Sequence, residues 1–142
     1  MEFWFIAALV AALAYGLHNI FTKIAAGHIS DALGAFLLEI TASVCILLYI
    51  FFLITTNEKF SFSSRGVIFS IVAGICVGVG TVLYFYIFSH GGELSIAGPL
   101  VLVGGVLLMA VAGIIFFKEK VSLIKIVGIT LGIISLWMLK SS

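Results

Sequence analysis

The sequence predicts an all-α integral membrane protein with five transmembrane helices in one antiparallel bundle. Of its 142 residues, 63% are hydrophobic and only 9% are charged, whereas soluble domains have roughly 25% charged residues. The mean hydropathy is +1.37. The apolar residues are gathered in five long runs, separated by short polar segments. We expect a single domain over residues 1–142, located in a cell membrane, either the plasma membrane or a bacterial inner membrane.

A helix needs roughly 20 apolar residues to cross a hydrocarbon core of ~30 Å, and five runs reach or approach this length. They are residues 3–26, 32–54, 66–88, 94–117 and 122–139. The short linkers force each helix to run antiparallel to the one before it. An isolated strand would leave backbone polar groups unsatisfied in lipid, so helices are the expected form.

The first run begins with "MEFWF", which lacks the basic segment of a signal peptide, and it contains His18, Asn19 and Lys23. These features favour a retained span over a cleaved signal. The second run is apolar throughout except for Glu39, whose neighbourhood reads "AFLLEITASV". Ionisable side chains are costly inside a membrane and usually face a bundle interior, a cavity or a partner.

The third and fourth runs contain features that shape helix packing. Ser70, Gly74 and Gly78 recur at steps of four, and small residues at this spacing let helices approach closely in lipid. We expect this face of the third helix to pack within the chain. Pro99 lies early in the fourth run, where it is expected to shape the start of the helix.

The fifth run is the shortest, with Lys125 one turn inside it. The long lysine side chain can reach the interface, so we expect this run to span as well. Gly128 and Gly132 in "GITLG" form a second small-residue pair. Because a terminal span exposes one side to lipid, we predict these two glycines at a dimer interface.

The basic residues favour a cytoplasmic N-terminus. Because the number of spans is odd, the two termini lie on opposite sides. Five basic residues fall on the N-terminal side and two on the other, and cytoplasmic loops carry an excess of Lys and Arg. The five are Lys59, Arg65, Lys118, Lys120 and Lys125, and the two are Lys23 and Lys140.

Polar side chains gather on one face of each of the first two helices, as 3.6 residues per turn requires. On the first helix these are Tyr15, His18, Asn19 and Thr22, and on the second they are Glu39 and Ser43. With Ala26 and Ala32 at the membrane surface and a rise of ~1.5 Å per residue, His18 lies about 12 Å deep and Glu39 about 11 Å deep. We therefore expect His18 and Glu39 to lie at nearly the same level on adjacent helices.

Two interpretations of Glu39 remain open. In the first, Glu39 carries a proton or balances a cation in a central cavity, held by His18 or Asn19. In the second, Glu39 bonds the same residues as a structural clasp between two helices. The candidate binding residues for substrate or protons are Glu39, His18, Asn19, Tyr15, Ser43 and Tyr84; Tyr84 also fits an aromatic belt at the membrane interface.

Other functions find no support in the sequence. It has no nucleophile elbow, phosphate loop, HExxH motif or pair of acids in an aqueous loop, so we expect no enzyme activity, no catalytic residues, no cofactor and no metal. Cys45 and Cys76 both lie in apolar runs and are interpreted as small hydrophobic residues. The net charge of +1 gives no reason to expect nucleic acid as a partner.

Several stretches together resemble the EamA-like branch of the drug/metabolite transporter superfamily. They are "AYGLHNIFTKIA", "GTVLYFYIFSHG" and "GIIFFKEKVSLIKIVGITLGIISLWML", and the last of these is the most specific. Members usually carry this five-helix unit twice, in inverted orientations around a central cavity, whereas this chain has one copy. Where many members have an arginine, this chain has Glu39, and it has Tyr15-Gly16 where Trp-Gly is typical.

The resemblance implies a half-transporter that completes its cavity with a second subunit, as inverted repeats do at their interface. We therefore predict a homodimer, or a heterodimer with a related five-helix subunit, embedded in the lipid bilayer. The dimer would export or exchange a small metabolite or cationic compound by alternating access, with protons as a possible coupling ion. Two alternatives are a membrane accessory or scaffold subunit that transports nothing, and a component of a flippase for lipid-linked substrates.

Overall fold

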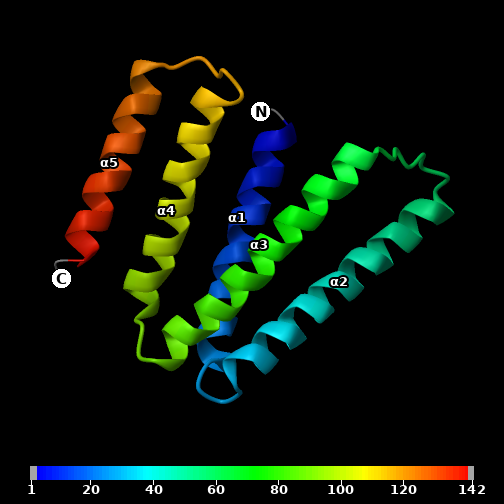
Figure 1. The fold of residues 1–142 in the computed structure, drawn as a ribbon, viewed down its shortest axis with the longest axis horizontal. Coiled ribbons are helices and arrows are strands. Elements are labelled where there is room, and N and C mark those ends of the chain that lie inside the picture. The colour runs from blue at the N-terminus through cyan, green and yellow to red at the C-terminus, as the bar shows by residue number, and fades with distance from the viewer. Residues whose placement is uncertain (1–2, 141–142) are drawn as a thin grey trace. The chain divides into compact units, whose positions relative to one another are not determined.

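The computed structural model describes residues 3–140, and this part of the chain folds into five helices, shown in Figure 1. No helix boundary differs from the predicted run by more than two residues, which confirms the predicted all-α architecture. Residues 1–2 and 141–142 of the predicted domain lie outside the described residues. The helices are α1 (Phe3–Ala25), α2 (Asp31–Thr55), α3 (Ser64–Ser89), α4 (Leu94–Ile115) and α5 (Leu123–Lys140).

Four of these helices, α1 to α4, are long and apolar enough to cross a membrane. The fifth helix has 18 residues, which at a rise of ~1.5 Å per residue gives about 27 Å. This is slightly less than the ~30 Å of a typical hydrocarbon core. That α5 also spans the membrane stays a prediction.

Each connection between helices contains a residue that accommodates a left-handed backbone. Gly27 between α1 and α2 and Gly91 between α3 and α4 have φ angles of 88° and 92°, which glycine adopts without steric cost. Asn57 has φ of 57° and Lys118 has φ of 53°. The connections can therefore be short, and they return α2 antiparallel to α1, α3 antiparallel to α2, and α5 antiparallel to α4 (Figure 1).

The described chain divides into two units, one ending at Gly91 and the other beginning at Gly92. In the first unit α3 packs against α1 and α2. The buried side chains of this unit cluster where α1 ends, α2 begins and α3 ends. They are Asn19, Thr22, Ala35, Tyr84, Phe85 and Phe88.

Gly34 of α2 packs tightly against α3. A Cβ atom placed there would overlap the ring of Phe85, which is itself only 2% exposed. A side chain larger than hydrogen therefore has no room at this point. Because lipid provides no hydrophobic drive for helices to associate, such close packing is what joins them.

Away from this contact the two helices diverge (Figure 1), and all of residues 40–52 in α2 and 64–77 in α3 are exposed. We predicted that the face of α3 with Ser70, Gly74 and Gly78 packs within the chain. For Gly74 and Gly78 this prediction is wrong. A Cβ atom built at Gly74 or at Gly78 would meet no described atom within 4 Å. The reason is that α2, the nearest candidate partner, has already moved away at this level.

The second unit consists of α4 packed against α5. After α4 ends, the chain folds back so that the amide of Glu119 donates to the carbonyl of Gly113 at 3.1 Å. The Glu119 carboxylate then forms an ion pair with Lys125 at 3.1 Å. The α5 helix begins with the Ser122 hydroxyl accepting from the amide of Lys125 at 3.2 Å, as the N-cap residue of a helix does.

We expect Gly34→Ala to lower the thermal unfolding midpoint of the purified protein in detergent. The added methyl group would displace the buried ring of Phe85, and overpacking of this kind costs about 1–3 kcal/mol. Gly16→Ala in α1 is the matched control, because no described atom lies within 4 Å of a Cβ atom there. That control should keep or slightly raise the midpoint, and equal midpoints for the two variants would contradict the assigned contact.

Candidate functional site

The carboxylate of Glu39 forms a hydrogen bond with α3. The hydroxyl of Thr81 donates to Glu39 Oε1 at 2.5 Å, and both residues are partly buried. The sequence analysis predicted that Glu39 would bond with His18 or Asn19 of α1. The structure instead gives Glu39 a partner on α3.

The register of the antiparallel helices explains this contact. Glu39 lies eight residues after the first residue of α2, Asp31, and Thr81 lies eight residues before the last residue of α3, Ser89. At a rise of ~1.5 Å per residue, each is about 12 Å from the end of its helix. His18 lies seven residues before Ala25, the last residue of α1. His18 and Thr81 are therefore at nearly the same depth, and depth alone does not decide which of them contacts Glu39.

Helical periodicity also points to Thr81. Thr81, Tyr84, Phe85 and Phe88 follow the spacing i, i+3, i+4 and i+7, which places them on one face of α3. The last three of these are buried, so the face that carries them is the packed face. Sequence reasoning missed Thr81, although its depth and its position on this face together could have identified it.

Glu39 and Thr81 lie at the limit of the packed region. Beyond Glu39 the next thirteen residues of α2, 40–52, are exposed, and the part of α3 that precedes Gly78 is exposed as well. The hydrogen bond therefore joins the two helices just before they separate. We call this point the vertex of α2 and α3.

The other predicted site residues take separate positions. His18 lines a cavity of about 380 Å³ between α1 and α2, which is otherwise mostly apolar and includes Leu38 and Thr41. Tyr15 is 65% exposed, and its ring forms an edge contact with that of His18, with centroids 6.4 Å apart. Asn19 is buried.

Ser43 is one helical turn from Glu39, but its hydroxyl donates to the backbone carbonyl of Glu39 at 2.9 Å. It therefore does not hold the carboxylate.

Tyr84 is buried against Phe88, with ring centroids 4.6 Å apart. The hydroxyl of Tyr84 is enclosed and has no hydrogen-bond partner in the part of the chain that the structure describes. The structure thus brings together Glu39 and Thr81, and does not assemble the predicted residues around one point.

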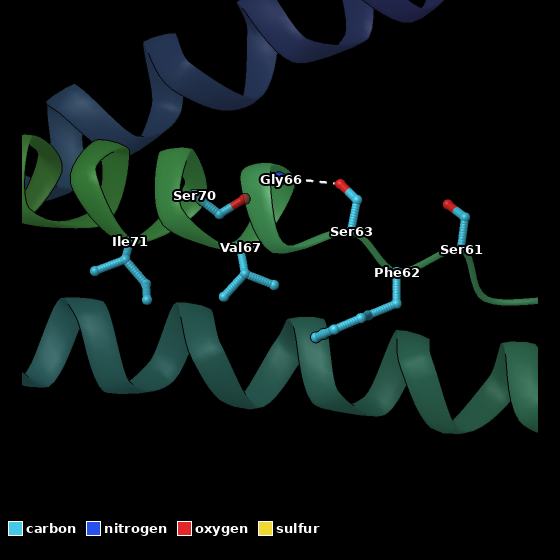
Figure 2. A pocket seen from close by; sticks show the side chains of 7 residues that line it. All are labelled: Ser61, Phe62, Ser63, Gly66, Val67, Ser70 and Ile71. Atoms are coloured by element: carbon cyan, nitrogen blue, oxygen red, sulfur yellow. Dashed lines mark hydrogen bonds between the residues drawn. The ribbon is translucent and has the colours of Figure 1, made fainter.

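A second cavity, of about 600 Å³, lies at the opposite end of α3 from the packed region. It is lined by residues 61–71, among them Phe62, Ser63, Val67 and Ile71. Figure 2 shows Phe62, Val67 and Ile71 pointing toward α2, while the hydroxyl of Ser63 points away and accepts from the amide of Gly66. The side chains that point toward α2 at this end are therefore apolar, whereas three of the seven residues that line the cavity are serines and none belongs to α2.

The predicted dimer-interface glycines line a groove within the second unit. Gly128 and Gly132 border a cavity of about 310 Å³ between α4 and α5. A Cβ atom at Gly132 would lie 3.4 Å from Cγ1 of Val103, so this glycine permits α5 to approach α4 in its own chain. A contact of the same face with a second subunit stays a prediction.

Within residues 3–140, no group of three or more His, Cys, Asp or Glu side chains is placed to hold a metal ion. The chemistry available at the vertex is therefore hydrogen bonding and proton exchange by one carboxyl group and one hydroxyl group. Cys45 and Cys76 are exposed free thiols.

Long apolar helices, short connections and a carboxyl group within the spans define a multi-pass α-helical membrane protein. Residues 2–141 match the EamA-like transporter family, so the chain belongs to this family, as its sequence motifs indicated. Family members are transporters rather than enzymes. A search of curated proteins and a search of solved structures each found no match.

Proposed function

We propose that this protein is a half-transporter that moves a small metabolite or cationic compound across the membrane, with Glu39 as its proton-binding or cation-binding group. The observation that carries this proposal is the hydrogen bond between Glu39 and Thr81 at the vertex of α2 and α3. Membership of a transporter family supports the general class of function. The position of the carboxyl group supports its specific role.

A carboxylate about 12 Å from the end of its helix is expensive for a membrane protein to keep. Translocon scales give about 2.5–3.5 kcal/mol for a charged residue at the centre of a transmembrane helix. A single neutral hydrogen bond between membrane helices contributes on average about 0.6 kcal/mol. A clasp could therefore be made more cheaply from two neutral side chains, and this difference favours a functional role for the charge.

The shape of the first unit supports access to Glu39 from one side. The two helices are in contact toward the end where α2 begins, and diverge toward the end where α2 finishes and α3 starts. A substrate or proton entering between them from the wide end would reach the vertex last. Alternating access then requires the contact near Gly34 to open while the wide end closes. By the distribution of basic residues, the wide end is on the cytoplasmic side.

A second subunit would complete the cavity. The exposed residues of α2 and α3 at the wide end are mostly apolar, and the open face of Gly74 and Gly78 can receive another helix closely. We propose a dimer, either of two identical chains or with a related five-helix chain, in an antiparallel arrangement.

Glu39→Gln should abolish proton-coupled flux, because the amide keeps an oxygen that can accept from Thr81 but cannot bind and release a proton. The measurement uses full-length protein in liposomes with an imposed pH gradient and a trapped pH-sensitive dye. Small amines, amino acids and quaternary ammonium compounds are added one at a time. We expect at least one compound to accelerate collapse of the gradient in the wild type, and none to do so in Glu39→Gln.

Thr130→Ala serves as the control in the same assay, since the hydroxyl of Thr130 donates to the backbone carbonyl of Ile126 in its own helix, α5, and the variant should retain its flux. Full proton-dependent flux in Glu39→Gln would contradict the role of Glu39. A lower thermal unfolding midpoint in Glu39→Gln, with no compound moved by the wild type, would instead favour the accessory or scaffold function.

An antiparallel dimer predicts that a cysteine near the N-terminus of one chain cross-links to a cysteine near the C-terminus of the other. The experiment is done in native membranes after both natural cysteines are replaced, by Cys45→Ser and Cys76→Ser. Mixed links between the two ends are the expected product. Links only between like ends would show a parallel dimer and contradict this part of the proposal.

A further inference from the structure

The hydroxyl of Thr81 lies within hydrogen-bond distance of two acceptors on different helices. One is Glu39 Oε1 of α2 at 2.5 Å, and the other is the backbone carbonyl of Val77 in its own helix, α3, at 2.9 Å. A hydroxyl group has a single hydrogen to donate. A full hydrogen bond to one acceptor therefore excludes a full hydrogen bond to the other.

We propose that Thr81 is a positioning residue whose hydroxyl changes acceptor when Glu39 gains or loses a proton, so that proton binding on α2 alters the hydrogen bonding of α3. This inference rests on the proposed role of Glu39 as the proton-binding group. It adds a residue outside the predicted site and a route by which protonation reaches the backbone.

With Glu39 ionised, the carboxylate can only accept hydrogen bonds, so the Thr81 hydroxyl donates to it. The carbonyl of Val77 then keeps only its ordinary helical bond from the amide of Thr81, four residues on. With Glu39 protonated, its carboxyl group donates to Thr81 Oγ1, and the hydroxyl hydrogen turns to the carbonyl of Val77. Neither state leaves a donor without an acceptor, which matters in a membrane because lipid offers none.

The second state affects the shape of α3. A threonine hydroxyl that bonds to the carbonyl four residues earlier often bends a helix. Gly78 and Gly80 lie between Val77 and Thr81 in "VGVGT", and glycine in a helix interior is less stable than alanine. This weak segment lies at the vertex, where a small bend is magnified along the diverging part of α3.

Few other titratable groups are near enough to take over this role. On α3, within two turns of Thr81, they are Cys76, Tyr84 and Tyr86. On α1 they are His18, which lines the cavity between α1 and α2, and Lys23, whose ammonium lies 5.3 Å from the ring centre of Phe88. Thr81 is the side chain that contacts the Glu39 carboxylate through a hydrogen bond.

The test is a pH titration of the full chain in lipid bilayers by infrared difference spectroscopy. The carbonyl stretch of protonated Glu39 is assigned by its loss in Glu39→Gln. Thr81→Val removes the hydroxyl while keeping the shape of the side chain, and Thr81→Ser keeps the hydroxyl. Thr81→Ala replaces Thr81→Val if the valine variant does not fold, as judged by circular dichroism.

We expect the distance between spin labels at Ile50 of α2 and Ile68 of α3 to change between low and high pH in the wild type and to stay fixed in Thr81→Val. Thr81→Ser should restore the pH-dependent change, because it keeps the hydroxyl that links the Glu39 carboxyl group to the carbonyl of Val77. The infrared band of Glu39 shows in each variant that the carboxyl group has taken up its proton.

An undiminished pH-dependent distance change in Thr81→Val would overturn the inference, even if Glu39→Gln abolishes flux, because protonation would then reach α3 by another route. A distance that does not change with pH in the wild type would overturn it as well. If Glu39→Gln keeps full proton-dependent flux, the proposed function fails. The distance measurement on Thr81→Val still reports separately on the coupling through Thr81.

Discussion

The first unit depends on one constraint: a carboxyl group within membrane-spanning helices must have a hydrogen-bond partner that the protein itself supplies. Thr81 meets this requirement for Glu39. Because the partner is on the neighbouring helix, the requirement also fixes how α2 and α3 are paired. The contact sets their register, marks where their packing stops, and places the one carboxyl group of α2's interior where the two helices begin to separate.

Close packing and hydrogen bonding hold α2 and α3 together at different points along their length. Near the end where α2 begins, Gly34 receives the buried ring of Phe85, and the helices are held by contact alone. At the other end residues 40–52 of α2 and 64–77 of α3 are exposed, and residues such as Phe62 and Ile71 point toward α2 (Figure 2). Glu39 and Thr81 separate these two regions. A chemical change there can alter how far the open ends diverge without disturbing the contact at Gly34.

Sequence reasoning predicted the helices well because length and hydropathy determine them, and it found Glu39 because a charge is conspicuous in an apolar run. It did not find Thr81. Depth along antiparallel helices fitted both His18 and Thr81, and only the packed face of α3, with Phe85 and Phe88 buried on it, distinguishes them. The prediction that Gly74 and Gly78 pack within the chain was wrong for a related reason. Small residues at steps of four show that close packing is allowed, but the sequence does not show where two helices diverge.

The most direct test of this account is the identity of the side chain that contacts Glu39 in a lipid bilayer. Solid-state nuclear magnetic resonance on protein labelled with ¹³C in glutamate, threonine and histidine can detect it, with the Glu39 carboxyl signal assigned by its loss in Glu39→Gln. The account predicts a cross peak between the Glu39 carboxyl carbon and the Thr81 side chain. A cross peak to the ring of His18, with none to Thr81, would contradict it and restore the pairing expected from the sequence.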